Sequence, residues 1–141
     1  MTYTSWFKEH ARKHKIIIDK LVAKNYTKEQ IIEYFDFDNM VAEENNFCLL
    51  YKDNEKCHDM EKLNCYLCAC PNFRFDDKGI KKVGKNTQFS FCDINHKDGS
   101  QDVYSTKIHQ NCSKCDVPHK LSYIKKHFDL DWSKAMKQSI L

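Results

Sequence analysis

The chain has 141 residues, of which 41% are hydrophobic and 13% aromatic, so it can bury one core and is expected to fold as one compact domain. Three glycines and two prolines exclude a low-complexity linker. The formal charge of +3 counts all eight thiols as neutral. If all eight were thiolates around two divalent ions, the net charge would fall by four, to −1. The composition therefore does not favour nucleic acid as a partner.

The N-terminus has no apolar signal segment, and the longest aliphatic run, Ile16–Ile18, is too short to span a bilayer. We therefore expect a cytoplasmic protein that does not insert into membranes. In that reducing compartment, paired cysteines are more often metal ligands than disulfides.

Residues 1–46 are predicted to be a helical extension. The first helix covers residues 5–24, with Ser5 as its N-cap and Asn25 as its stop. His10 and His14 lie one turn apart and could bind a metal, but a half-buried helix surface is the favoured interpretation. The predicted apolar face consists of Trp6, His10, His14, Ile17, Ile18 and Leu21.

Two shorter helices are predicted to follow. Thr27 and Gln30 have the spacing of a capping box and open the second helix. Residues 36–38 interrupt it, and Asp38 is expected to cap a third helix that runs to Glu44.

Residues 47–121 are expected to form a Cys-rich metal-binding module. Helical periodicity fades here, and residues 87–94 and 103–108 are the candidate strands, joined by a hairpin loop at 95–100. Residues 122–141 are predicted to be helical and to pack on this module.

Asp131 is predicted to cap the last helix, which would carry Trp132, Met136 and Ile140. The predicted fold class is therefore a small, zinc-stapled α+β domain, in which flanking helices cover an irregular Cys-rich core with a short β-hairpin.

The spacing of the cysteines predicts tetrahedral metal sites. Two pairs, Cys65/Cys68 and Cys112/Cys115, have the two-residue spacing that directs both sulfurs to one ion. Buried free thiols are the alternative, but they have no reason to cluster so tightly. The candidate ligands are Cys48, Cys57, His58, Cys65, Cys68, Cys70, Cys92, Cys112, Cys115 and His119.

Two ions are favoured over one because Cys68 and Cys70 are two residues apart. In an extended segment their sulfurs would point to opposite sides, so Cys65 and Cys68 are expected on one ion and Cys70 on the other. Adjacent side chains rarely reach the same ion. Either Cys57 or His58 is therefore expected to hydrogen-bond a ligand sulfur or a carbonyl instead.

Zinc is the expected metal because thiolate and imidazole donors suit it. An iron–sulfur cluster is the main alternative, although the C-x2-C-x-C-P run matches none of the usual cluster spacings. Copper(I) binding and thiol redox chemistry are further alternatives.

The central region resembles a known family. Cys57-His58, then C-x2-C-x-C-P at residues 65–71, and C-S-x-C-x-x-P-H at residues 112–119 are similar to the cysteine-rich small domain family, which is described as zinc-finger-like and occurs in bacteria and archaea. The resemblance covers about Cys48 to Lys120 and implies a metal-binding module. Many members carry another cysteine shortly after Cys-Pro, where this chain has none, so the resemblance implies that Cys92 replaces it.

A non-catalytic role is favoured, as a metal-binding adaptor or regulatory module that contacts another protein. The zinc deaminase pattern, HExxH, the P-loop and GxGxxG are all absent from the sequence. Two alternatives remain open. One is a nucleic-acid-binding zinc protein that uses the aromatic and basic residues of 73–91, and the other is an enzyme with a catalytic zinc or a reactive cysteine.

Overall fold

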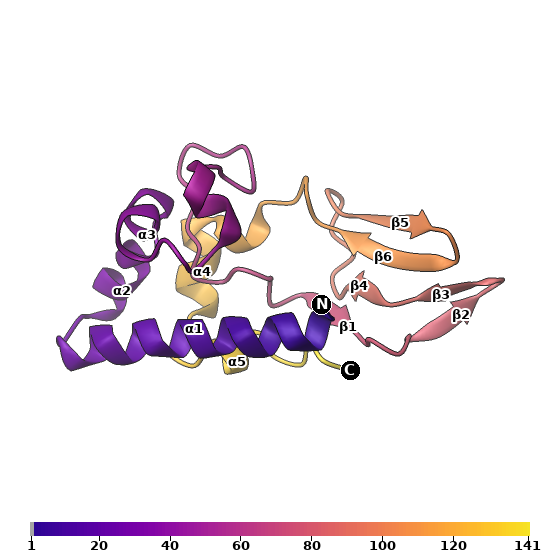
Figure 1. The fold of residues 1–141 in the computed structure, drawn as a ribbon, viewed down its shortest axis with the longest axis horizontal. Coiled ribbons are helices and arrows are strands. Elements are labelled where there is room, and N and C mark those ends of the chain that lie inside the picture. The colour runs from indigo at the N-terminus through magenta and orange to yellow at the C-terminus, as the bar shows by residue number, and fades with distance from the viewer. Residues whose placement is uncertain (1) are drawn as a thin grey trace.

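The computed structural model describes residues 2–141 and has the predicted α+β architecture, with helices at both ends of the chain and short strands between them. Helices and sheets occupy opposite ends of the molecule (Figure 1). The helices are α1 (Tyr3–Ala23), α2 (Lys28–Tyr34), α3 (Phe37–Glu43), α4 (Leu121–His127) and α5 (Trp132–Ala135), with 3-10 helices η1 (Leu49–Asp53) and η2 (Val117–His119). None of the helices within residues 2–141 is long and apolar enough to cross a membrane.

Helix α1 begins earlier than predicted, and its cap is not Ser5. Thr2 is the N-cap: its side chain accepts a hydrogen bond from the Ser5 backbone, and the Ser5 hydroxyl accepts one from the Thr2 backbone. The Asp77 carboxylate accepts hydrogen bonds from the backbone N–H groups of Tyr3 and Thr4, at 2.9 and 3.1 Å. A residue distant in sequence thus satisfies the first N–H groups of the helix.

The capping box of Thr27 and Gln30 at the start of α2 is confirmed. The predicted start of the third helix is wrong, because Asp36 rather than Asp38 precedes α3. The helix starts earlier because Phe37 is buried in the core and its N–H donates to the Leu63 carbonyl at 2.9 Å. Tertiary contacts therefore decide where this helix begins.

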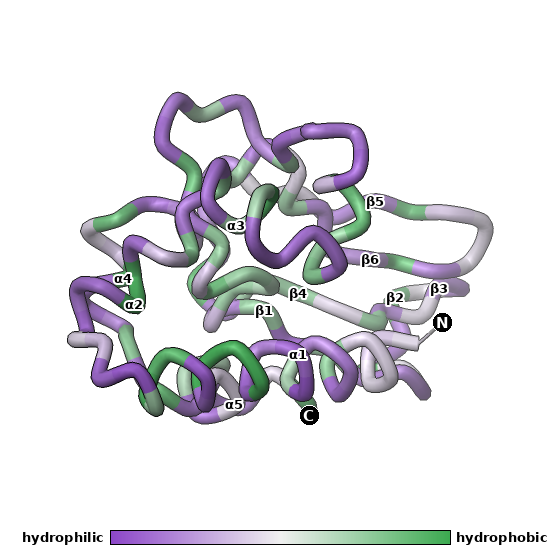
Figure 2. The backbone as a smooth tube through the Cα atoms, turned by 60° about the vertical axis from the view of Figure 1, so that its left-hand side comes forward, coloured by the Kyte–Doolittle hydropathy of each residue, from purple (hydrophilic) through white to green (hydrophobic). Residues whose placement is uncertain are grey.

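The hydrophobic core lies in the helical part of the molecule. The hydrophobic stretch of α1, green in Figure 2, packs against α2, α3, α5 and the segment around Tyr66. His10 and His14 are buried rather than half-buried, and they stack on aromatic rings. The largest fully buried side chains include Phe35, Tyr66, Phe75, Leu21, Met40, Leu67, Ile124 and Met136.

Phe35 has no solvent exposure and contacts the rings of His14, Phe47 and Tyr66. The substitution Phe35→Ala should therefore lower the free energy of unfolding by about 3–5 kcal/mol, through lost burial and the cavity that remains. Urea denaturation measures this change. A loss of about 1 kcal/mol or less would mean that the helical core is not packed as described.

Two small sheets replace the predicted pair of strands. Strand β1 (Phe73–Phe75) pairs with β4 (Ser90–Cys92), while the order of the second sheet is β2 (Lys81–Val83), β3 (Asn86–Gln88), β6 (Lys107–Asn111) and β5 (Ser100–Tyr104). β3 and β6 are parallel, and the other pairs are antiparallel. Residues 87–94 are therefore not one strand, since they belong to both sheets.

The predicted strand at 103–108 is wrong because a tight turn interrupts it. Ser105 adopts a positive φ of 58°, which lets the chain reverse between β5 and β6. The hairpins are β2–β3 and β5–β6, and residues 95–100 connect the two sheets rather than closing a hairpin.

The end of the chain departs from the predicted helix. Asp131 caps α5 as predicted, with its carboxylate accepting from the Ser133 N–H. Lys137 has a positive φ of 57°, however, and the helix ends before it. Ile140 lies beside β1, where the Phe75 N–H donates to the Ser139 carbonyl at 2.8 Å and the Leu141 N–H donates to the Phe75 carbonyl at 3.0 Å.

Candidate metal centre

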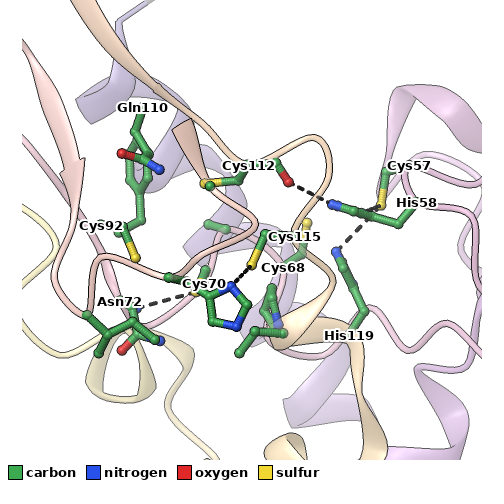
Figure 3. Close-up of a pocket in the computed structure, with 17 residues that line it drawn as sticks. Cys57, His58, Cys68, Cys70, Asn72, Cys92, Gln110, Cys112, Cys115 and His119 are labelled. Carbon is green, nitrogen blue, oxygen red and sulfur yellow. Dashed lines mark hydrogen bonds between the residues drawn. The ribbon is translucent and has the colours of Figure 1, made fainter. Parts of the chain in front are cut away.

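A cavity of about 200 Å³ lies between the helical and sheet parts of the molecule. Six of the eight cysteines line it, and all eight are free thiols (Figure 3). The cysteines and histidines of its wall are Cys57, His58, Cys68, Cys70, Cys92, His96, Cys112, Cys115 and His119.

Both predicted Cys-x-x-Cys pairs form tight turns. The Cys68 N–H donates to the Cys65 carbonyl at 3.4 Å, and the Cys115 N–H donates to the Cys112 carbonyl at 3.0 Å. These turns bring the two side chains of each pair to the same side, as a shared ion requires.

The helices fix the position of the first turn. His14 Nε2 donates to the Tyr66 carbonyl at 3.1 Å, and Trp132 Nε1 donates to the Cys68 carbonyl at 3.2 Å. The Tyr66 hydroxyl donates to the Asp129 carbonyl at 2.7 Å. α1 and the C-terminal segment therefore hold the backbone of the first cysteine pair.

Cys68 and Cys70 diverge because the backbone between them is unusual. Ala69 and Cys70 have φ angles of 93° and 82°, a region that residues with a side chain rarely adopt. Such a conformation persists only where surrounding contacts hold it, and here the Cys70 N–H donates to the Leu67 carbonyl at 3.0 Å. The chain thereby turns Cys70 toward β4 and the second cysteine pair.

Cys48, Cys57, Cys65 and Cys68 form a first group, which we call the first quartet. Burial raises the pKa of Cys65 to about 12, partly offset by the adjacent Tyr51 hydroxyl, and charge on Cys57 and Cys48 raises it further. Burial also raises the pKa of Cys68, and Cys65, Cys57 and Cys48 add to that rise. Thiolates at these positions would repel one another through their negative charges, and a divalent cation bound among them would offset that repulsion.

Cys70, Cys92, Cys112 and Cys115 form the second quartet. Burial raises the pKa of Cys112 to about 12, and charge on Cys70, Cys115 and Cys92 raises it further. Burial raises the pKa of Cys70 to about 11, with Cys92 and Cys115 contributing in the same direction. Charge interactions thus link Cys65 and Cys68 with Cys48 and Cys57, and Cys70 with Cys92 and the second pair, although no three sulfurs of either quartet within residues 2–141 lie within 4.8 Å of one another.

Two predicted histidines lie next to Cys57. His119, on η2, is 4% exposed and has its Nε2 atom 3.5 Å from Cys57 Sγ. His58 has its Nδ1 atom 3.1 Å from the same sulfur, and its Nε2 donates to the Cys112 carbonyl at 3.0 Å. His58 therefore makes the kind of carbonyl contact that the sequence suggested, but it also reaches Cys57.

His96 is a further donor that the sequence analysis did not include among the ligands. Its Nδ1 atom lies 3.6 Å from Cys115 Sγ and accepts a hydrogen bond from the Asp98 N–H at 3.1 Å. The spacing Cys92-x3-His96 was an available signal, because Cys115 and His119 are separated by the same number of residues.

Two of the aromatic and basic residues of 73–91 are not available for stacking on a nucleic acid. Phe75 is fully buried, and Arg74 is 8% exposed. Arg74 donates to the carbonyls of Pro71 and Phe73 and lies 3.6 Å from Asp93. These contacts remove two of the groups on which the nucleic-acid hypothesis depended.

The Tyr51 hydroxyl provides a test of whether thiolate ligands fit the first quartet. It is buried beside Cys65 and lowers the pKa of that thiol, but no acceptor among residues 2–141 meets it with full hydrogen-bond geometry. A buried donor without an acceptor is costly, but a metal-bound thiolate is an acceptor that would satisfy it. The donor set and this unpaired hydroxyl both fit a bound zinc ion.

We expect Tyr51→Phe to lower the zinc affinity of the first quartet by about 10- to 100-fold, as loss of a hydrogen bond to a ligand typically does. Competition with a chromophoric chelator measures this affinity. The metal-free protein should become no less stable, since the substitution removes an unpaired group. An unchanged affinity would show that the hydroxyl does not contact a ligand sulfur.

Comparisons of the chain with models of protein families, with curated proteins and with solved structures gave no significant match. The resemblance to the cysteine-rich small domain family therefore stays a prediction from the motifs.

Proposed function

We propose that this protein is a structural zinc-binding module, in which one ion in each quartet joins the helical core to the sheets. The supporting observation is that the thiols raise one another's pKa within two sets of four, and four is the number of ligands in a closed structural zinc site. Because thiolate ligands must stay reduced, we place this function in a reducing compartment such as the cytoplasm.

The second quartet would connect segments that little else holds together. Its ligands come from the turn after Cys68, from β4 and from the loop after β6. Between residues 76 and 116, Ile108 and Cys115 are the two buried hydrophobic residues, and all of β2 is exposed. So small an apolar contribution cannot stabilise a sheet alone, and metal binding supplies folding free energy in small domains of this kind.

The burial of the thiols supports a structural role over a reactive cysteine. Burial raises the pKa of Cys65 to about 12, which disfavours the thiolate that a nucleophile needs. Two histidines could act as a base for a free thiol. His109 instead contacts the Tyr3 hydroxyl through Nδ1 at 2.6 Å, whereas His96 Nδ1 lies 3.6 Å from Cys115 Sγ and accepts from the Asp98 N–H.

Metal analysis of serine variants tests the proposal. Cys65→Ser should lower the zinc content by removing the ion of the first quartet, and Cys92→Ser should do so by removing that of the second. The folded fraction from gel filtration under reducing conditions is the sample to analyse, with Ser133→Ala as a surface control. Zinc content that neither substitution lowers would contradict the proposal.

A further inference from the structure

Three donor atoms converge at the edge of the first quartet. Cys57 Sγ, His58 Nδ1 and His119 Nε2 all lie within 4.8 Å of one another, and no other three metal-binding side chains within residues 2–141 are this close. Figure 3 shows both imidazoles directed toward Cys57.

The hydrogen bonds of the two histidines define which nitrogen is free. His119 Nδ1 lies 2.9 Å from the Asn64 carbonyl, and His58 Nε2 lies 3.0 Å from the Cys112 carbonyl. A carbonyl only accepts, so both of these nitrogens carry the proton. In the neutral imidazoles, His119 Nε2 and His58 Nδ1 are therefore lone pairs.

Both lone pairs face Cys57, whose single S–H can donate to only one of them at a time. An imidazole that donates to a carbonyl through one nitrogen and exposes the other is the usual arrangement of a metal-binding histidine. A sulfur at about 2.3 Å and a nitrogen at about 2.0 Å from one tetrahedral ion lie roughly 3.6 Å apart. Cys57 Sγ lies 3.5 Å from His119 Nε2, which matches, and 3.1 Å from His58 Nδ1, so the His58 ring must move slightly away from the sulfur when the ion binds.

More potential metal ligands surround Cys57 than one four-coordinate ion can bind. In the proposed function the first quartet supplies four sulfurs to its own ion, and four ligands complete a tetrahedral shell. His58 and His119 are therefore two additional donors next to a thiol that the quartet shares.

We propose that Cys57, His58 and His119 bind a third zinc ion, with the Cys57 thiolate bridging it to the ion of the first quartet. This inference rests on the proposed function. Cys57 is exposed and His58 is only partly buried, so the fourth position of this ion faces solvent. Water or another small donor ligand occupies that position, in contrast to the closed shells of the two structural ions.

The test is the zinc content of the full-length reduced protein, measured by native mass spectrometry. We expect three ions in the wild type and two in the double variant with His58→Gln and His119→Gln. The single variant His58→Gln, at a partly buried position, should also lose the third ion even if His119→Gln impairs folding. His127→Gln, outside the cavity, is the matched control and should retain three.

Nitrogen-15 NMR of the histidine rings provides a second measurement on the same sample. Zinc loading should shift the signals of His119 Nε2 and His58 Nδ1, while their partner nitrogens stay protonated. Two ions per wild-type chain, whether or not the histidine variants lose one of them, would overturn the third site. A chain that binds no zinc would instead contradict the proposed function itself.

Discussion

Removal of zinc is expected to unfold the sheet part of the protein while the helical core keeps much of its structure. A strong chelator under reducing conditions should abolish amide protection across residues 76–116, and α1 should stay protected. The reason is the uneven distribution of the core, since the buried cluster draws on the helices and the Tyr66 segment rather than on the four-stranded sheet. Structural zinc typically contributes about 10–16 kcal/mol to such folds.

Hydrogen exchange with mass spectrometry resolves the two parts in one experiment. Adding zinc back should restore protection, which separates metal loss from irreversible thiol oxidation. If the metal-free protein kept full protection in β5 and β6, the sheet would be stable without metal and the structural role would be wrong.

The second large expected effect is a loss of stability at acidic pH, which originates from two buried histidines. Burial lowers the pKa of His10 to about 3, and positive charge on His14 and Lys13 lowers it further. Burial also lowers the pKa of His14 to about 4, against a smaller opposing effect from its contact with the Tyr66 carbonyl. Both side chains are therefore neutral in the folded protein at pH values where they are charged in the unfolded chain.

The sign of the effect follows from proton binding. Between about pH 6.5 and the folded-state pKa, the unfolded chain binds more protons, so stability is complete above pH 6.5 and falls as the pH decreases. At pH 5 each histidine costs roughly 2 kcal/mol relative to neutral pH.

His10→Phe removes one of these titrations and the unpaired Nε2 atom that the core buries. The variant should exceed the wild type in stability by roughly 2 kcal/mol at pH 5, with a smaller difference at pH 7.5. Urea denaturation of zinc-loaded protein at both pH values measures this, and acid release of metal affects both proteins alike. His127→Gln is the control. Equal pH dependence of wild type and His10→Phe would show that His10 is not buried as a neutral ring.

Local patterns in the sequence predicted the parts of the fold that depend on local interactions. Helical spacing predicted the buried face of α1 except at its start, where Phe7 rather than Trp6 is buried. Thr27 and Gln30 predicted the α2 cap, because both features are set by residues a few positions apart. The start of α1 was predicted incorrectly, since Thr2 rather than Ser5 is the cap of a local capping box, to which Asp77 adds contacts from another part of the chain.

Local sequence patterns were also insufficient to predict the sheet and the metal centre. Nothing in the residue type of Ser105 indicates the left-handed turn between β5 and β6. The two Cys-x-x-Cys pairs could be predicted from the sequence because each pair lies within a single tight turn. The positions of Cys48, Cys92 and His96 depend instead on how separate segments pack, so spacing alone could not assign them.

X-ray absorption of the anaerobically purified protein at the metal edge is the most direct test of the claim that the cysteines are structural metal ligands. The account predicts a zinc edge and a shell of mainly sulfur neighbours at about 2.3 Å, with a minor nitrogen contribution. An iron edge with iron–iron scattering would identify a cluster instead. A protein without a metal edge, or with a shell of oxygen and nitrogen alone, would contradict the account.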